Sequence, residues 1–252
     1  IKNLLEKSTA FRKKQGAIIF ESPNSKIRLF KDKVVINKLE KTISQIIIAE
    51  SMILMGYITS LYINKYNLAA PFRTQKINCN PSEILTRYKD SEIKYIILKQ
   101  NMGRSFITTK PGEHESLGLK MYVQCTSPLR RYLDLIIQRQ VYNKINNHEL
   151  LSINSVSKIV DYSKIRQSEN NNIYKNDKYK FLKLFFKNEN KPFYKIIFVK
   201  WINHKRNIAL VYFSEYSLEI LITLFVSIEI YSNKIYKVKY IINDNNLLEF
   251  IY

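Results

Sequence analysis

The residues best suited to chemistry stand together in the segment 126–135. Thr126 and Ser127 precede a proline, and the adjacent arginines Arg130 and Arg131 follow it. Because hydroxyl side chains cap the first amides of a helix and proline fits its first turn, this order predicts a helix that starts here. Two guanidinium groups beside such a terminus would attract an anion such as a phosphate group. The apolar face of the helix would comprise Leu129, Leu133, Ile136 and Ile137.

A capped amphipathic helix with two solvated arginines would give the same local pattern, so the composition of the whole chain matters. The 252 residues include 41 lysines and arginines against 21 acidic residues, a formal net charge of +20. Such a charge favours polyanionic partners. The chain also has 18 tyrosines and 13 phenylalanines, and single-stranded nucleic acids stack their bases on such rings. An A/T-rich genome would also enrich these residue types without any selection for binding.

Cysteine content and hydropathy narrow the class of protein. The two cysteines, Cys79 and Cys125, are too few and too far apart for a disulfide framework or a zinc site, which fits a reducing compartment. The most apolar stretch, residues 43–62, is interrupted by Glu50 and small polar residues, so we expect a soluble protein without a membrane segment. The first residue is isoleucine and no leader-like segment follows, so we expect part of a longer or processed chain.

Hydrophobic periodicity divides the chain into a mixed part and a strand-rich part. The pattern predicts helices over residues 1–15, 40–67 and 81–101. From residue 194 onward apolar residues alternate, which predicts four or five strands that would close into a small barrel. The expected fold class is therefore α+β, with one domain over residues 1–190 and a barrel over residues 191–252. Shorter strands are expected at residues 16–20, 27–30 and 34–36, with a turn at residues 22–25.

The run Thr126-Ser-Pro-Leu-Arg-Arg-Tyr132, followed by Asp134-Leu135, resembles the closing signature of the RNB catalytic domain of the ribonuclease II and ribonuclease R exoribonucleases. Further blocks follow in the order of this family, and the resemblance extends over roughly residues 10–185. The combination of Ser116-Leu-Gly-Leu with Tyr122-Val-Gln is most similar to the variant of cyanobacteria and plastids. The other blocks are Arg12 with Gly16-Ala-Ile-Ile-Phe20, Glu50-Ser-Met52, Pro71-Phe-Arg73, Met102-Gly-Arg104 and Arg166-Gln-Ser-Glu169.

The resemblance implies a fold, an activity and a set of site residues. The fold would be the C-terminal part of an RNB domain, with mixed helices and sheet, followed by an OB-like barrel that binds RNA. The activity would be 3′-to-5′ hydrolysis of single-stranded RNA to nucleoside monophosphates. Arg130 would be a catalytic residue that neutralises charge at the phosphorus, and Glu50 is the second catalytic candidate. The residues that would bind RNA are Phe20, Arg73, Tyr122, Thr126, Ser127, Arg131 and Glu169.

Several of these roles have alternatives. Glu50 would orient a metal-bound water, bond a ribose hydroxyl or simply pair with an arginine. Phe20 would stack on a base near the RNA 3′ end or be an ordinary core residue, and Arg73 would contact phosphate or form a surface salt bridge. Asp134 would support the two arginines together with its neighbouring tyrosine. Ala49 stands where the family carries a further acid before Glu50, so one carboxylate of that pattern is lost.

The aspartate cluster that binds magnesium in this family has no counterpart in the chain, whose aspartates are scattered. We therefore expect the magnesium ligands in an upstream polypeptide, and a chain that is inactive alone but forms part of a longer or split exoribonuclease. One alternative is a catalytically inactive RNB-like subunit that binds RNA within a larger transcription or RNA-processing complex. Another is a basic structural subunit. The composition and the cyanobacterial variant suggest a plastid or another organelle, and otherwise the cytoplasm.

Overall fold

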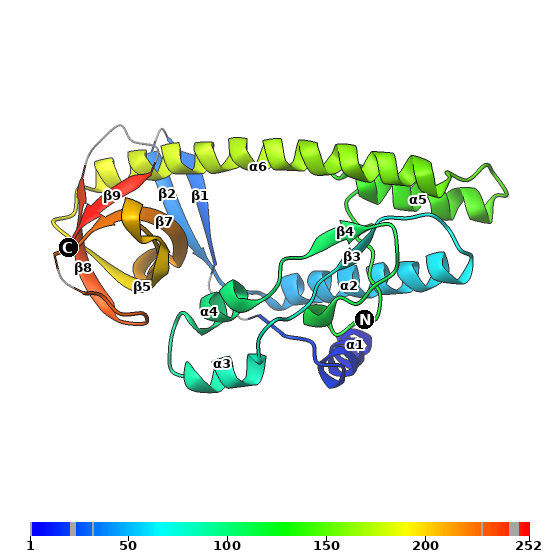
Figure 1. Ribbon diagram of the computed structural model, residues 1–252, viewed down its shortest axis with the longest axis horizontal. Coiled ribbons are helices and arrows are strands. Elements are labelled where there is room, and N and C mark those ends of the chain that lie inside the picture. Colours follow the sequence, from blue (N-terminus) through cyan, green and yellow to red (C-terminus); the bar gives the residue numbers. More distant parts are fainter. Residues whose placement is uncertain (1, 21–23, 32, 228, 242–246) are drawn as a thin grey trace. The chain divides into compact units, whose positions relative to one another are not determined.

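The structure is a computed structural model that describes residues 2–20, 24–31, 33–227, 229–241 and 247–252 (Figure 1). Its fold combines mixed helices and small sheets with a closed barrel at the C-terminal end, which confirms the expected α+β class. The chain forms two compact units, each assembled from separate stretches, and the domain boundary expected at residue 190 stays a prediction. The helical unit comprises Ile1–Ile19, Lys41–Asn80 and Asn101–Glu169, and the barrel unit comprises Phe20–Glu40, Pro81–Gln100 and Asn170–Tyr252.

The helical unit consists mainly of helices joined by loops and a two-stranded antiparallel sheet. Strands β3 (Phe72–Thr74) and β4 (Phe106–Thr108) pair with Arg73 opposite Ile107. Val123 precedes α5 in the chain. Buried apolar side chains from α2 and α5 pack around it, and together they form one core cluster of this unit. The helices are α1 (Lys2–Lys14), α2 (Ile43–Lys65), the 3-10 helix η1 (Glu115–Leu117), α5 (Tyr132–Ile145) and the first part of α6 (Ile153–Glu189).

Helix α2 begins at a capping box. The Thr42 hydroxyl accepts a hydrogen bond from the Gln45 backbone amide at 3.2 Å, and the Thr42 amide donates to the Gln45 side-chain oxygen at 3.2 Å. These bonds satisfy amides that the start of a helix leaves unpaired. The helix expected over residues 40–67 is therefore confirmed, and it runs from Ile43 to Lys65.

Contrary to the expectation of no membrane-length segment, α2 is long and apolar enough to cross a bilayer by length and composition alone. Glu50 and small polar residues interrupt the run, but the isoleucines, leucines and methionines outweigh them and give a mean hydropathy of 1.7. Core helices of soluble proteins pass the same test, and 28% of this stretch is buried within the protein. Length and hydropathy are thus properties that a core helix and a membrane span share.

Close packing against α2 fixes the segment that contains Tyr122. A Cβ atom at Gly56 would lie 2.3 Å from the Val123 carbonyl oxygen and 2.4 Å from the Tyr122 ring. One turn further along α2, the Ser60 hydroxyl donates to the Met121 carbonyl oxygen at 3.3 Å. Glycine is required at position 56 because the backbone of another segment approaches the helix too closely for any side chain.

The barrel unit contains a closed barrel whose described strands follow the order β5-β6-β7-β9-β8. Strands β7 and β9 are parallel, and the other neighbouring pairs are antiparallel. This arrangement is that of an OB-type Greek-key barrel. The barrel strands are β5 (Tyr194–Asn203), β6 (Ile208–Phe213), β7 (Leu218–Phe225), β8 (Ile235–Ile241) and β9 (Leu248–Ile251), and the remaining elements are β1 (Asn24–Phe30), β2 (Lys33–Leu39), α3 (Pro81–Arg87), α4 (Lys94–Asn101), η2 (His204–Arg206) and η3 (Ser214–Tyr216).

Phe186, near the C-terminal end of α6, fills the core of the barrel. It is fully buried, and its ring centroid lies 5.0 Å from that of Tyr194 and 5.4 Å from those of Phe213 and Phe250. The contacts with Tyr194 and Phe250 are edge-to-face and the contact with Phe213 is tilted, and such ring pairs add to the stabilisation from burial. The β1–β2 hairpin packs against the same cluster through one isoleucine of each strand.

Some local expectations differ from the structure. Residues 16–20 form an irregular segment instead of a strand, because the Ala17 and Ile18 amides donate to the carbonyl oxygens of Arg12 and Ser116. The helix expected over residues 81–101 is divided into α3 and α4 by a turn. The strands expected at residues 27–30 and 34–36 are confirmed as β1 and β2, and the turn expected before them lies partly outside the described residues.

We expect Gly56→Ala to destabilise the helical unit. Overpacking of this kind costs about 1–3 kcal/mol, and a gain of up to about 1 kcal/mol in helix propensity offsets only part of it. Urea denaturation should therefore show a lower unfolding free energy. Ser44→Ala, at an exposed position of the same helix, should change it by less than about 0.5 kcal/mol. A Gly56→Ala protein as stable as the wild type would contradict the close approach.

Candidate functional site

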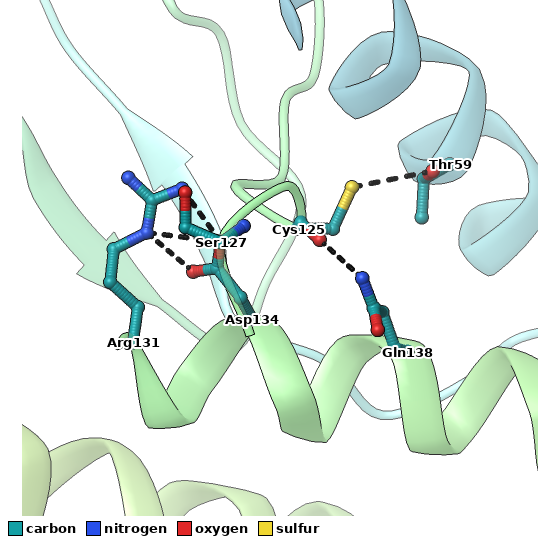
Figure 2. Close-up of polar contacts among 6 residues, drawn as sticks. All are labelled: Thr59, Cys125, Ser127, Arg131, Asp134 and Gln138. Carbon is teal, nitrogen blue, oxygen red and sulfur yellow. Dashed lines mark hydrogen bonds and ion pairs between the residues drawn. The ribbon is translucent and has the colours of Figure 1, made fainter. Parts of the chain in front are cut away.

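The buried carboxylate of Asp134 organises the loop before α5 (Figure 2). Its Oδ2 atom accepts a hydrogen bond from the Ser127 backbone amide at 2.8 Å. The Arg131 side chain donates to the same carboxylate from Nε at 3.0 Å and from Nη2 at 2.7 Å. A two-pronged bond of this type fixes the plane of a guanidinium group. Asp134 therefore holds the loop and orients Arg131, which agrees with the supporting role that the sequence indicates.

The start of the helix differs from the expectation. Helix α5 begins at Tyr132 with Arg131 as its N-cap residue and without a capping side-chain bond. The residues before it form a separate turn, in which the Ser127 carbonyl accepts from the amides of Arg130 and Arg131 at 3.3 and 3.0 Å. Leu129 protrudes from this turn fully exposed instead of joining the apolar face. The physical reason is the Asp134 carboxylate, which ties Ser127 back to α5 and prevents the helix from extending.

Arg73 and Arg131 lie close enough for their charges to interact. Arg73 is half-buried on β3, where its Nη1 donates to the Ser105 hydroxyl at 3.4 Å and its amide donates to the Tyr122 carbonyl at 2.8 Å. Burial lowers the pKa of the Arg73 guanidinium, and the nearby Arg131 lowers it further. An anion between two such groups relieves both the repulsion and the loss of solvation. Arg130 is exposed in the adjacent turn.

A neutral histidine lies beside Arg73. His114 is 8% exposed, and its ring meets the edge of the Tyr122 ring with centroids 5.7 Å apart. Burial, with a smaller contribution from Arg73, lowers the pKa of His114 to about 4. Burial also raises the pKa of the Tyr122 hydroxyl. Both rings are therefore uncharged near neutral pH and provide an apolar wall that strengthens the charges next to them.

Cys125 connects the loop before α5 to two helices (Figure 2). The Cys125 thiol donates to the Thr59 hydroxyl of α2 at 3.6 Å, and the Cys125 carbonyl accepts from the Gln138 side chain of α5 at 2.8 Å. Both cysteines of the chain are free, and burial raises the pKa of the Cys125 thiol. Cys125 is thus a packing residue that places the loop between α2 and α5.

Glu50 takes part in a different set of contacts. Its two carboxylate oxygens accept bonds from Arg12 Nη2 at 2.6 and 2.7 Å, and Arg12 Nη1 donates to the Leu117 carbonyl at 3.1 Å. Arg12 is 2% exposed and Glu50 is 9% exposed. A buried charge requires such a partner because desolvation is costly. Of the three roles open to Glu50, these contacts correspond to pairing with an arginine, and its catalytic role stays a prediction.

The remaining candidates take part in other contacts. Phe20 is half-buried in the barrel unit, where its ring lies 6.1 Å from that of Tyr95. Glu169 is exposed on α6 and pairs with Arg166 at 2.9 Å. The structure thus gathers Arg73, Tyr122, Ser127 and Arg131, with Thr126 and Arg130 in the adjoining loop. No local sequence pattern placed His114 and Ser105 beside Arg73, because both come from separate loops.

The described residues of this chain do not suit a magnesium ion. No group of three or more Asp, Glu, His or Cys side chains that could hold a metal occurs within residues 2–20, 24–31, 33–227, 229–241 and 247–252. Magnesium prefers oxygen ligands and usually needs carboxylates to hold it. The only carboxylate in the site is that of Asp134 among the described residues, and Arg131 and Ser127 occupy its oxygens.

Removing the charge of Asp134 should destabilise the chain far more than removing that of Asp161. The side chain of Asp134 is 2% exposed in its pair with Arg131, whereas that of Asp161 is 68% exposed in an equally spaced helical pair with Lys164. We expect Asp134→Asn to lower the unfolding free energy by about 2–4 kcal/mol and Asp161→Asn by less than about 0.5 kcal/mol. Urea denaturation of both variants tests this, and equal effects would refute the anchoring role of Asp134.

His114 should make stability depend on pH. The unfolded chain has an ordinary histidine pKa of 6.5, and the folded chain has a value of about 4, so the unfolded state binds the proton more readily between these values. The contribution is fully present above pH 6.5 and is lost as the pH falls toward 4, by up to about 3 kcal/mol. His114→Gln should flatten this fall in denaturation curves, whereas His148→Gln, at an exposed histidine, should retain it. Parallel curves for His114→Gln and wild type would contradict the assignment.

Comparison with known proteins places these features in a family. Residues 1–147 match the RNB domain. An uncharacterized ribonuclease of Synechocystis is 29% identical over 219 residues, which cover 85% of this chain and 33% of that protein. The fold is shared with the Dss1 exoribonuclease of Candida glabrata, with a TM-score of 0.84 at 16% identity over 100% of this chain and 34% of that one. RNase R of Mycoplasma genitalium, solved with ribose-methylated single-stranded RNA, has a TM-score of 0.77 at 17% identity over 99% of this chain and 48% of that one.

The chain therefore spans between a third and a half of the length of these proteins. The RNB match covers more than half of the chain and includes the pair between Arg12 and Glu50 as well as the loop held by Asp134. With its fold and its sequence both matching, this chain belongs to the RNB domain family.

Proposed function

We propose that this chain is the phosphate-binding part of a hydrolytic 3′-to-5′ exoribonuclease that releases nucleoside monophosphates from single-stranded RNA. The observation that supports this most is the pair of neighbouring guanidinium groups, Arg73 and Arg131, with Arg130 exposed beside them. Two arginines of one turn with a third on the neighbouring strand β3 favour an anionic ligand, and phosphodiester groups are the anions of an RNA strand.

The different contacts of the arginines support different tasks for them. Arg131 is fixed by Asp134 and lies at the N-terminus of α5, so it would bind and position the RNA backbone together with the first amides of that helix. Arg73 is half-buried on β3, and from there it would bind the same RNA strand. Arg130 is exposed, and none of the described contacts restrains its side chain. It is therefore able to reach the reacting phosphate. There it would neutralise the charge that develops on phosphorus.

Single-stranded RNA is the substrate class that these properties favour. The net charge of +20 gives strong attraction to a polyanion, and the barrel has the OB-type arrangement that binds single strands in other proteins. RNase R of Mycoplasma genitalium, which shares the fold, was solved with a single-stranded RNA. In this proposal Phe20, Tyr122, Thr126, Ser127 and Glu169 contribute to RNA binding as the sequence indicates.

Hydrolysis requires groups that the described part of the chain does not offer. A magnesium site needs clustered carboxylates, and none is formed by the described residues. The proposal therefore includes an upstream polypeptide that supplies these ligands, and magnesium bound there would activate water for attack on the phosphodiester. The chain by itself would bind RNA without cleaving it.

A second function is favoured by the same residues. Ala49 stands in place of an acid, and Glu50 is fully engaged by Arg12, so the helix that contains them presents no unpaired carboxylate within the described residues. A relative with this arrangement could bind RNA without any hydrolysis, as a subunit or scaffold of a larger transcription or RNA-processing complex. The two functions share the phosphate-binding site and differ only in whether the bound RNA is cut.

Substitution of Arg130 separates binding from catalysis. With magnesium and the polypeptide encoded directly upstream, Arg130→Ala should slow monophosphate release by about 100-fold to 1,000-fold, because it removes a charge that acts on the transition state. The affinity for a 3′-tailed RNA should fall by less than about 5-fold, since surface cations share that attraction. Arg139→Ala, an exposed arginine on the same helix, should leave both quantities nearly unchanged.

Each outcome of this experiment selects a function. Equal losses of cleavage and affinity in Arg130→Ala would reject its catalytic role. RNA that binds but is never cut, with or without the upstream polypeptide, would support the scaffold instead. A wild-type affinity that hardly changes with salt would reject phosphate binding altogether, because release of counterions makes such affinity fall steeply with salt.

A further inference from the structure

Helix α2 buries its small and polar residues and exposes its large apolar ones. Its buried side chains include Glu50, Gly56, Thr59 and Ser60, with Ile63 as the one large apolar member. In a helix at the surface of a finished domain the reverse holds, since the apolar stripe faces the core. The large exposed side chains that share one side of the helix are Ile43 at 64%, Ile48 at 59%, Met55 at 54%, Ile58 at 53% and Leu61 at 43%, and we call them the α2 apolar face.

The exposed apolar surface continues onto α1. Leu4 is 62% exposed and Phe11 is 47% exposed, and both line an apolar pocket between α1 and α2 together with Leu54 and Tyr57. The rings of Phe11 and Tyr57 lie 6.5 Å apart. A contiguous apolar area of this kind on a soluble protein marks an interaction site, because water contact along it is unfavourable.

The contacts on the opposite face of α2 show that the helix is not surrounded by lipid. Gly56 faces the Val123 carbonyl and the Tyr122 ring, and Ser60 bonds to the Met121 carbonyl. Between this packed face and the α2 apolar face, Glu50 forms a buried ion pair with Arg12 of α1. A helix that packs against protein on one face and exposes large apolar side chains on the other has the character of a core helix whose second layer is absent.

Charge and length identify what would cover the open face. A second copy of this chain would add another charge of +20, so long-range repulsion opposes self-association. The RNB relatives are longer: the chain covers 33% of the Synechocystis ribonuclease and 48% of RNase R. The uncovered part of such a protein is large enough to supply a second layer. A polypeptide that brings clustered carboxylates would also complement the basic charge.

We propose that the α2 apolar face and the adjoining α1 pocket are the docking surface for the carboxylate-bearing polypeptide. The inference rests on the proposed function and names the place where its two parts meet. Binding would bury the exposed isoleucines of α2 on the side of the helix opposite to Tyr122. The same helix would then join the phosphate-binding loop on one face to the carboxylate-bearing partner on the other, which ties the two halves of the site to one rigid element.

The experiment titrates the full chain with the polypeptide encoded directly upstream and measures the dissociation constant by calorimetry. Ile58→Glu and, independently, Met55→Glu place a charge in the centre of the α2 apolar face and should weaken binding by at least about 30-fold. Ile165→Glu makes the same substitution at a 61% exposed isoleucine of α6 and should leave the constant unchanged. All three variants should bind single-stranded RNA like the wild type, because none of these residues belongs to the phosphate site.

Each alternative occupant has its own signature. Sedimentation that shows a dimer of the chain, dispersed by Ile58→Glu, would overturn the proposal in favour of a second copy. Binding of mixed phosphatidylcholine and phosphatidylglycerol vesicles, lost in Ile58→Glu but not in Ile165→Glu, would overturn it in favour of a lipid surface. Absence of any complex with the upstream polypeptide would also overturn it, as would a complex that Ile58→Glu and Met55→Glu leave intact.

The docking surface and the proposed function fail in different ways. A complex that forms through α2 but never releases monophosphates leaves the interface standing and rejects the exoribonuclease. A complex that cleaves RNA but is indifferent to charge at Ile58 and Met55 leaves the exoribonuclease standing and rejects the interface.

Discussion

The carboxylate of Asp134, withdrawn from water and shared between the Ser127 amide and the Arg131 guanidinium, determines the form of the candidate site. A buried charge must be paired, and here the pairing links the loop to the first turn of the helix that follows it. The loop consequently stays a turn instead of becoming helix, and Arg130 projects into solvent while Arg131 is held. One ion pair therefore makes two adjacent arginines different in exposure and in the contacts open to them.

Helix α2 relates this site to the rest of the helical unit. Gly56 lets the Tyr122–Val123 segment lie directly on the helix, and Thr59 receives the Cys125 thiol from the same loop. A helix with small residues on one face and large apolar residues on the other can pack a backbone closely on the first face and a second layer on the other. The small face is filled within this chain, and the large face is open. Helix α1 covers a further part of α2, where Arg12 pairs with the buried Glu50.

In the proposed function, the site would be the cationic half of a phosphodiester-hydrolysing centre. Arg73 and Arg131 repel each other in the absence of an anion, and burial increases that repulsion, so the arrangement is one that RNA binding would relieve. The carboxylate half is not formed by the described residues. The RNB relatives are two to three times longer than this chain. Docking through α2 would bring the halves together in a protein assembled from two chains, and a scaffold would use the cationic half alone.

The sequence by itself determined the elements whose pattern is local. The periodicity of α2 with its Thr42 cap, the alternation in the barrel strands and the run from Thr126 to Leu135 each encode bonds between near neighbours, so the helices, the barrel and the family could be predicted. Only the tertiary structure decided the start of α5, the pairing of Glu50 with Arg12 and the approach of Arg73 to Arg131. These depend on contacts between residues far apart in the chain, where the balance of burial and charge pairing overrides local preference. The exposed face of α2 likewise follows from packing, because hydropathy alone does not tell which side of an apolar helix is covered.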